Sequence, residues 1–417
     1  MERTDKSEKS RAAGSGDFET GAVPGSASKG FWALFVVMLG FTFFSASMSV
    51  GAKLGNGLSL GGFAGAVAVG GLILLVYTGS LAYVGSATGL SMDLLARRAF
   101  GTKGSYLPSA MIALTQIGWF GVGIAMFAFP VSELLGINPW ILVIVAGVAM
   151  TASSWWGIDA LFWVSIISVP LITVLGCLSV GMAAGSGNLA DLFAQSQSMP
   201  FFTAVGLVVG SFVSGGTATP NFVRFARTKW IAVLTTGIAF FLGNTLMFVF
   251  GAVGGAVTGQ EDIFYVMIAQ GLTIPAILVL GANIWTTNDN ALYSAGLGLS
   301  NITGAKKKPM TLIGGVIGTV AAIWLYNNFV SWLSLLNGTL PPVGAILVID
   351  YFMHRENYRE GAEPGTAIKP ASVVGVILGA AVANLVPWGI ASINAMAVAA
   401  LCYFVGEAAE KMMKKAG

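Results

Sequence analysis

The chain is poor in the residues that carry most enzyme chemistry. It has 417 residues, but only two cysteines, one histidine and 9% charged residues. Two cysteines exclude a disulfide framework and a multi-cysteine metal cluster, and a single histidine excludes a histidine-based catalytic or zinc site. The sequence also offers no paired nucleophile and base. We therefore expect a protein that is not an enzyme.

The low charge content is typical of a membrane protein. About 25% of residues are charged in an average soluble domain, whereas here 9% are charged and 55% are hydrophobic. The net charge of +3 is too small to indicate nucleic-acid binding. The 56 glycines are well above the usual share of about 7%, as expected where apolar helices pack closely in a bilayer.

Stretches without Asp, Glu, Lys or Arg are long enough to cross a bilayer many times, since one crossing needs about 20 apolar residues. Eight such stretches hold one span each, namely 31–52, 54–92, 104–132, 134–158, 160–190, 192–223, 230–260 and 263–288. Two longer ones, 309–349 and 370–406, hold two spans each. We predict an all-α polytopic membrane protein with twelve transmembrane helices.

The basic residues support this count. With the N-terminus inside, 20 of the 21 Lys and Arg lie in segments predicted to be cytoplasmic, where short loops collect them, and only Lys53 lies outside. Both termini are therefore predicted to be cytoplasmic. The predicted organisation is a disordered tail (1–29), spans one to five (30–186), spans six to ten (187–353), a cytoplasmic loop (354–369), spans eleven and twelve (370–408) and a second tail (409–417).

Ionisable residues inside the predicted spans are few, and each is a candidate functional residue. Asp289 is the clear one, whereas Asp159 and Asp350 lie near predicted cytoplasmic span ends and are interpreted as caps or interfacial groups. No Lys or Arg lies at mid-membrane, so the cargo is predicted to be neutral. The missing arginine-rich helix excludes a voltage sensor, and the missing phosphate-binding loop excludes a P-loop ATPase.

Clusters of small residues predict two broken helices. They lie in residues 42–51 of the first span and in residues 210–217 of the sixth, which contain the pair Gly215-Gly216. Secondary transporters bind cargo at mid-membrane where two helices unwind. A separation of five spans suits two inverted five-helix repeats. The alternative is that the small residues only pack helices together.

Two further spans carry unusual polar side chains. In the third, Gln116 and Trp119 share a helical face, and an amide beside an aromatic ring suits a flat polar heterocycle. Trp119 alone is more often explained by packing or by a place in the aromatic belt at the membrane interface. In the eighth, Thr286 and Thr287 together with freed carbonyls would form an all-oxygen Na+ site, unless they bond to the preceding turn. Residues 337–342 predict a bend or gate because Pro341 and Pro342 interrupt a helix.

Several of these segments resemble the bacterial cytosine permeases, which belong to the nucleobase and cation symporter family. The resemblance is carried by residues 23–30, 42–48, 115–121, 210–213, 222–225 and above all 283–293. It extends from about Val23 into the eleventh span. It implies a leucine-transporter-like fold and Na+-coupled uptake of cytosine across the cytoplasmic (inner) membrane by alternating access. No organic cofactor is implied, and we expect the chain to function as a monomer.

The resemblance also implies the residues of the site. Cytosine would stack between Trp119 and Phe212, with hydrogen bonds from Gln116, Ser45, Ser211, Ser214 and Asn283. Sodium would be bound by the carbonyls of Phe44, Ser47 and Asn283 and by the hydroxyls of Thr286 and Thr287. Ser49 stands where a bulkier aromatic residue often appears in the family, and Gly215-Gly216 replaces a less glycine-rich pair.

Two rival functions stay open at the level of sequence. The first is a proton-coupled permease for a purine, uracil or hydantoin that uses Asp289, the one mid-membrane carboxylate on the predicted ion-site helix. The second is a gated channel, or a sensor without transport.

Overall fold

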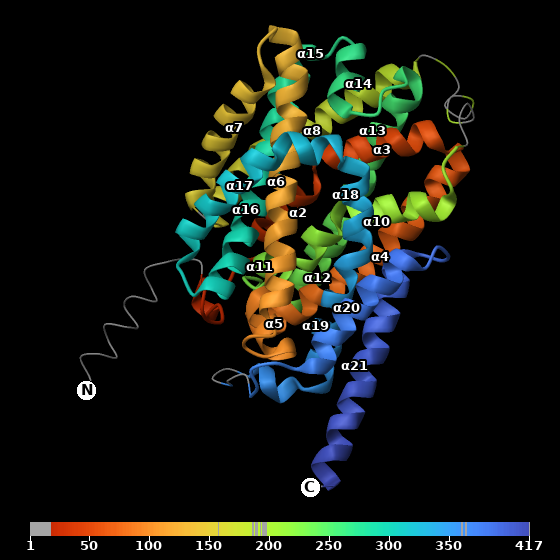
Figure 1. Cartoon of the computed structure of the whole chain (residues 1–417). Coiled ribbons are helices and arrows are strands. Elements are labelled where there is room, and N and C mark those ends of the chain that lie inside the picture. The colour runs from red at the N-terminus through yellow and green to blue at the C-terminus, as the bar shows by residue number, and fades with distance from the viewer. Residues whose placement is uncertain are drawn as a thin grey trace, which may run out of the picture.

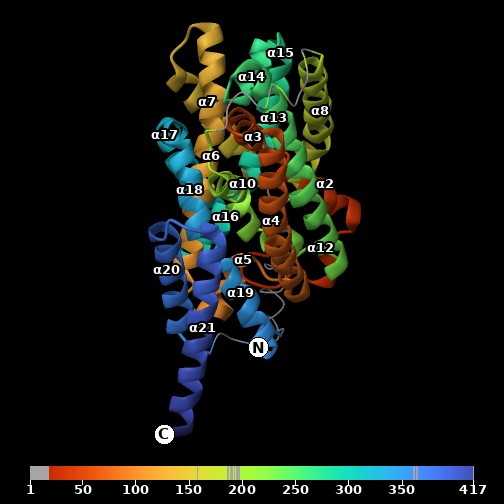
Figure 2. The ribbon, with the colours of Figure 1, turned by 90° about the vertical axis from the view of Figure 1, so that its right-hand side faces the viewer.

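The computed structural model describes residues 18–156, 158–185, 187, 191, 193, 198–359, 362 and 365–416. Within these residues the regular elements are helices, and an isolated β-bridge joins Lys29 to Ala226. Figures 1 and 2 show the helices as one elongated bundle. The prediction of an all-helical chain is confirmed.

The described residues include eight helical segments that are long and apolar enough to cross a membrane. They are α4 (Leu60–Thr88), α6 (Tyr106–Leu135), residues Ser165–Ala184 of α8 (Ile158–Ala184), α10 with α11 (Phe201–Thr217 and Pro220–Val223), the run from α12 (Lys229–Gly237) through the π-helix η3 (Ile238–Gly243) to α13 (Asn244–Thr258), α17 (Lys307–Asn327), α18 with α19 (Phe329–Thr339 and Pro341–Met353), and residues Ala391–Met413 of α21 (Ala391–Ala416).

Other helices are less regular candidates for membrane spans. The helices α2 (Phe31–Thr42) and α3 (Ser45–Gly57) form one span with a bend of 49°, and α7 (Pro139–Ser153) and α20 (Pro370–Leu385) are apolar but short. The helix α16 (Gly281–Thr303) is long enough to cross a membrane but is not apolar enough to be counted among these spans, because polar side chains crowd its first half. The number of twelve spans therefore stays a prediction.

Contacts between helices repeat with an offset of five spans. In the predicted numbering, the first span (α2 and α3) contacts the fifth (α8) and the seventh (α13). In the same way, the sixth span (α10) contacts the tenth (α18) and the second (α4). The central helices α6 and α16, which occupy matching positions, pack on each other. Because five is odd and successive spans alternate in direction, two sets related in this way have opposite orientations. This pattern is the one expected of inverted repeats, whose boundaries stay predictions.

Glycines let α3 and α13 approach at backbone distance. A Cβ on Gly251 would lie 1.7 Å from the Met48 carbonyl oxygen, and one on Gly51 would lie 2.2 Å from that of Phe248. Gly55 and Gly255 make similarly close approaches farther along the same pair. Such packing of small residues holds helices together in a bilayer, where the hydrophobic effect does not drive them together.

The two ends of the bundle carry different elements. The helix α5 (Met92–Phe100) and the C-terminal end of α21 lie at the lower end in Figure 1, and α14 (Ile263–Ala269) and α15 (Thr273–Pro275) lie at the upper end. Lys53, the one basic residue outside the predicted cytoplasmic segments, forms an ion pair with Glu261, which precedes α14.

The helix α5 is packed inside the protein, because most of its residues are buried. Its Asp93 carboxylate is buried and accepts a hydrogen bond of 2.6 Å from Ser109 Oγ of α6. Burial raises the pKa of Asp93 to about 6, and the hydrogen bond from Ser109 opposes this shift.

The N-terminal segment 18–29 departs from the predicted disordered tail. Its Val23 N–H donates to the Gly89 carbonyl at the end of α4, and Lys29 pairs with the chain on either side of Ala226. The Phe18 carbonyl accepts a hydrogen bond from the buried Arg224 guanidinium. Backbone pairing and this buried charge fix the segment. Residues 1–17 of the predicted tail lie outside the described residues, and the second tail is helical through Ala416.

Asp350 is a buried hub rather than a simple cap. It is 0% exposed, and its carboxylate accepts hydrogen bonds from Tyr358 (2.6 Å), Tyr403 (2.6 Å) and Lys369 (2.8 Å). These partners join the end of α19 to α20, α21 and the 3-10 helix η5 (Arg355–Tyr358). A buried carboxylate requires such pairing. The side chain of Asp159 lies outside the described residues.

Candidate substrate and ion site

The first span is interrupted at two residues. Phe43 (φ −76°, ψ 79°) and Phe44 (φ −122°, ψ 130°) leave the helical region between α2 and α3, and both are buried. The predicted break is thus confirmed at the start of residues 42–51, whereas Ser45–Gly51 are already helical. Backbone groups at such a break need partners because water is scarce at this depth.

The side chain of Asn283 supplies these partners. Its Oδ1 accepts hydrogen bonds from the Ser45 N–H (2.9 Å) and from Ser45 Oγ (2.9 Å), and its Nδ2 donates to the Phe43 carbonyl. One amide therefore satisfies both sides of the interruption and ties α16 to it. Ser45 and Asn283, predicted to contact the substrate, are used in this bond to each other.

The sixth span is not broken where we predicted. The helix α10 is continuous through Thr217, so the expectation of unwinding at Gly215-Gly216 is wrong. The two glycines provide space instead. A Cβ on Gly215 would lie 2.7 Å from the Phe41 ring, and one on Gly216 would lie 2.9 Å from Thr78. The helix α10 ends at Thr217, and α11 begins at Pro220.

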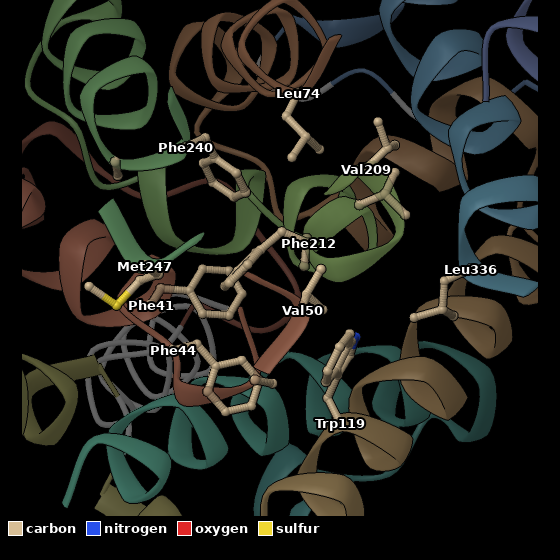
Figure 3. Close-up of a cluster of buried hydrophobic side chains, with 14 of the residues drawn as sticks. Phe41, Phe44, Val50, Leu74, Trp119, Val209, Phe212, Phe240, Met247 and Leu336 are labelled. Atoms are coloured by element: carbon tan, nitrogen blue, oxygen red, sulfur yellow. The ribbon is translucent and has the colours of Figure 1, made fainter. Parts of the chain in front are cut away.

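Aromatic rings from three helices meet beside the break (Figure 3). Trp119 of α6 and Phe44 lie edge to face with centroids 5.7 Å apart, and Phe44 and Phe212 of α10 lie 6.4 Å apart. Phe41 lies 5.3 Å from Phe212. The Trp119 indole N–H donates a hydrogen bond of 2.7 Å to Ser214 Oγ. The polar edge of the tryptophan is therefore held by α10.

These rings enclose a small cavity of about 10 Å³. Five of the predicted substrate residues line it, namely Gln116, Trp119, Ser211, Phe212 and Ser214. Phe44 and Thr287, predicted as ion ligands, line it as well. A space of this size holds about one water molecule, so a heterocycle enters only if the rings move apart.

Gln116 is the unsatisfied polar group of this cavity. The side chain is 1% exposed, and its Nε2 has no hydrogen-bond partner among the described residues. A buried amide without partners costs about 1–3 kcal/mol, and a ligand with an acceptor at this point would recover that cost. Ser211, in contrast, donates to the Val208 carbonyl of its own helix (2.7 Å).

The hydroxyls predicted to bind sodium lie on the same side of α16 as Asn283. Thr286 Oγ1 is 2.9 Å from Ser168 Oγ of α8, and Thr287 Oγ1 donates to the Asn283 carbonyl at 3.3 Å. Thr286 also bonds to the Ala282 carbonyl of the preceding turn (3.1 Å), so the alternative of back-bonding is observed for both threonines.

Hydroxyls without partners lie in the neighbouring helices. Ser47 Oγ of α3 and Ser165 Oγ of α8 are buried with no hydrogen-bond partner among the described residues. A Cβ on Gly40 would meet both Ser165 Oγ (2.1 Å) and the Thr286 methyl (3.3 Å), so α2, α8 and α16 are in contact here. The Phe44 carbonyl accepts a hydrogen bond from the Ser47 N–H (2.9 Å). The chemistry is that of neutral oxygens, which hard monovalent cations prefer.

Comparison with known proteins identifies the family. A family model described as a permease for cytosine/purines, uracil, thiamine and allantoin matches residues 22–406. The chain belongs to this permease family. It is 51% identical over 393 residues to the cytosine permease of Escherichia coli strain K12, covering 93% of this chain and 94% of the relative. It is 23% identical to a hydantoin permease of Microbacterium maritypicum, covering 68% and 64% of the two chains.

Solved structures support the fold of the permease. Mhp1, a nucleobase-cation-symport-1 family transporter in a closed conformation with bromovinylhydantoin bound, aligns with a TM-score of 0.81 at 19% identity, covering 93% of this chain and 94% of that one. A Na+-coupled sialic acid symporter in an outward-open state aligns with a TM-score of 0.69 at 16% identity, covering 93% and 90%. Together with membership of the permease family, the fold makes the chain a multi-pass membrane transporter and not an enzyme.

Asp289 of the permease lies away from the aromatic cavity. Its Oδ1 accepts a hydrogen bond of 2.7 Å from Ser153 of α7, and the Trp285 indole also bonds to Ser153. Asp289 follows Asn283 by six residues on α16, which places the two side chains about 120° apart around the helix, since each residue turns it by about 100°. The residue is buried, but it is not among those that line the cavity.

Sequence reasoning missed several residues of the site. Phe41 and Ala291 line the cavity, and Ser165 and Ser168 neighbour the threonines. The spacing of Phe41 and of the two serines in the sequence could have indicated them. Phe41 precedes Phe44 by three residues, and Ser165 and Ser168 share the same spacing, so each pair is placed near one helical face.

The bond network at the break predicts a stability effect in the permease. Replacing Asn283 with Ala leaves the Phe43 carbonyl and the Ser45 N–H buried without partners, each at a cost of about 1–3 kcal/mol. We expect a melting temperature several degrees lower in detergent. Asn290→Ala is the matched control, because its side-chain amide donates only to Thr286 of its own helix. Equal melting temperatures of the two variants would contradict the assignment.

Proposed function

We propose that the permease imports cytosine together with Na+ by alternating access. The observation that carries the proposal is the unpartnered Gln116 amide beside a box of aromatic rings at the break in the first span. The identity of 51% to a cytosine permease over nearly the whole chain supports cytosine as the cargo within the family.

The chemistry of the cavity matches a neutral pyrimidine. Cytosine has two π-faces and an edge on which an exocyclic amine donor stands beside ring nitrogen and carbonyl acceptors. Gln116 both donates and accepts hydrogen bonds, and Ser214 presents a hydroxyl that now holds the Trp119 indole. Trp119 and Phe212 offer the stacking faces, which are worth about 1–3 kcal/mol per base. No Lys or Arg lines the cavity within the described residues, which fits an uncharged cargo.

Binding requires a local rearrangement. The cavity of about 10 Å³ is far smaller than a pyrimidine ring. The aromatic rings here meet edge to face, and a ligand stacked between Trp119 and Phe212 has to displace them. The break at Phe43 and Phe44 gives the first span a hinge at the point where this movement is needed.

Sodium, the proposed second cargo, would be held by the carbonyls of Phe44, Ser47 and Asn283 and by the hydroxyls of Thr286 and Thr287. The contact of α16 with the break through Asn283 supports this placement. An ion that bridges the first span and α16 stabilises the arrangement that presents Phe44 and Thr287 to the cavity. Sodium and cytosine then favour each other's binding, and the coupling is reciprocal.

Moving one positive charge inward releases about 2.3 kcal/mol per 100 mV. That free energy alone supports accumulation of a neutral solute by roughly fiftyfold, since each 1.4 kcal/mol is a factor of ten. We further propose that the permease works as a monomer in the cytoplasmic membrane with both termini in the cytoplasm. The positions of the basic residues support this orientation.

The stacking residues provide the first test. We expect Trp119→Ala and Phe212→Ala each to weaken cytosine binding at least tenfold, because each removes a stacking face. Binding is measured by isothermal titration in detergent. Trp324→Ala and Phe404→Ala are the matched controls, since both side chains face outward at 66% and 49% exposure. Normal affinity in the Trp119 and Phe212 variants would rule out the stacking arrangement.

The coupling ion provides the second test. In proteoliposomes we expect a Na+ gradient to drive cytosine uptake, Thr287→Val to abolish it and Asp289→Asn to retain it, because Asp289 bonds to Ser153 away from the cavity. Uptake driven by a pH gradient without sodium and lost in Asp289→Asn would establish the proton-coupled alternative instead. Saturable counterflow of labelled cytosine separates a transporter from a channel or a sensor.

A further inference from the structure

A second, larger cavity lies at the end of the bundle that carries α5. Its volume is about 880 Å³, and it shares no lining residue with the aromatic cavity. Four parts of the chain form it: the N-terminal segment 22–28, the end of α4 at 86–89, the connection between α11 and α12, and the end of α19 with η5. We call it the arginine cavity.

The charge of the arginine cavity is of one sign. Arg224, Arg227, Arg355 and Arg359 line it, and no Asp or Glu is among its described lining residues. Arg359 pairs with Glu356 at 2.7 Å, on the protein surface. Arg227 and Arg355 are exposed and have no carboxylate partner within the described part of the chain. Two uncompensated guanidinium groups thus face one space.

Two buried groups complete the cavity. Arg224 is 2% exposed and is held by the Phe18 carbonyl (3.0 Å) and the Tyr293 hydroxyl (3.3 Å), so its charge is fixed in place. The Ser86 hydroxyl is buried and has no hydrogen-bond partner among the described residues. A fixed positive charge with a spare hydroxyl suits an anion with several acceptor oxygens, because guanidinium groups bind phosphate in the same way as carboxylate.

Residues beside the cavity indicate that it lies at the level of the membrane surface. Arg355 lies over the Phe352 ring, 5.1 Å from its centroid, and Phe352 is 47% exposed. Lys229 lies over the ring of Tyr83, which stacks on Phe352. Trp230 beside it is 72% exposed. Exposed aromatic rings that alternate with basic side chains mark the level of the lipid headgroups.

We propose that the arginine cavity binds a phosphate group, supplied by the headgroup of an anionic phospholipid at the cytoplasmic surface. Basic pockets between helices on this side of a membrane accept such headgroups. A bound phosphate would bridge the N-terminal segment, the connection between α11 and α12, and the end of α19. The site is independent of the cytosine proposal, because it shares no residue with the transport cavity.

Direct lipid binding tests the proposal. The purified full chain is titrated with phosphatidylglycerol or phosphatidylcholine in mixed micelles, and bound lipids are counted by native mass spectrometry. A parallel arm uses inorganic phosphate and follows the melting temperature. We expect Arg227→Gln with Arg355→Gln to weaken phosphatidylglycerol binding about 25-fold, or about fivefold for each charge lost. Ser86→Ala should weaken it further, which a purely electrostatic attraction to the surface would not do.

The matched control is Lys306→Gln with Lys308→Gln, which removes two charges at the same end of the bundle but outside the cavity. We expect the control to change binding less than twofold. Stabilisation by inorganic phosphate alone would support a phosphate site with a soluble source, and a response to phosphatidylglycerol alone would support the lipid source. An equal loss in the control, or no preference for either phosphate probe over phosphatidylcholine, would overturn the proposal.

Discussion

A spanning helix that stops at mid-membrane exposes backbone groups that lipid cannot satisfy, and the amide of Asn283 meets that demand here. It bonds to Ser45 on one side of the break and to the Phe43 carbonyl on the other. The same residue fixes α16 against the first span. This role explains why α16 carries so many polar side chains and is not among the apolar spans. The helix faces a break and a cavity rather than lipid.

Other features follow from the position of α16. Thr286 reaches α8 through Ser168, and Thr287 reaches the aromatic cavity. The proposed ion ligands and the proposed cytosine pocket therefore share one helix and one break, which is the physical basis for coupling between the two cargoes. Close glycine contacts hold α3 on α13, so the α3 half of the first span is fixed on a neighbouring helix.

Much of this arrangement is predictable from sequence, but side-chain pairing is not. Charge-free stretches predicted most of the apolar helices, although α16 extends to Thr303, well beyond the stretch 263–288. Gln116, Trp119 and Phe212 were identified and do line one cavity. The break at Gly215-Gly216 was wrong because a glycine pair also serves close packing, here against Phe41 and Thr78. Composition alone does not separate these two uses. The bond between Asn283 and Ser45 joins residues 238 positions apart, and no local pattern encodes it.

In the proposed mechanism, sodium organises the cytosine pocket through the first span and α16. The affinity of the purified wild-type permease for cytosine, measured by isothermal titration with Na+ or with choline at equal ionic strength, tests it most directly. We expect markedly tighter cytosine binding in sodium, and a reciprocal gain in sodium affinity when cytosine is present. The same cytosine affinity in both salts would contradict it.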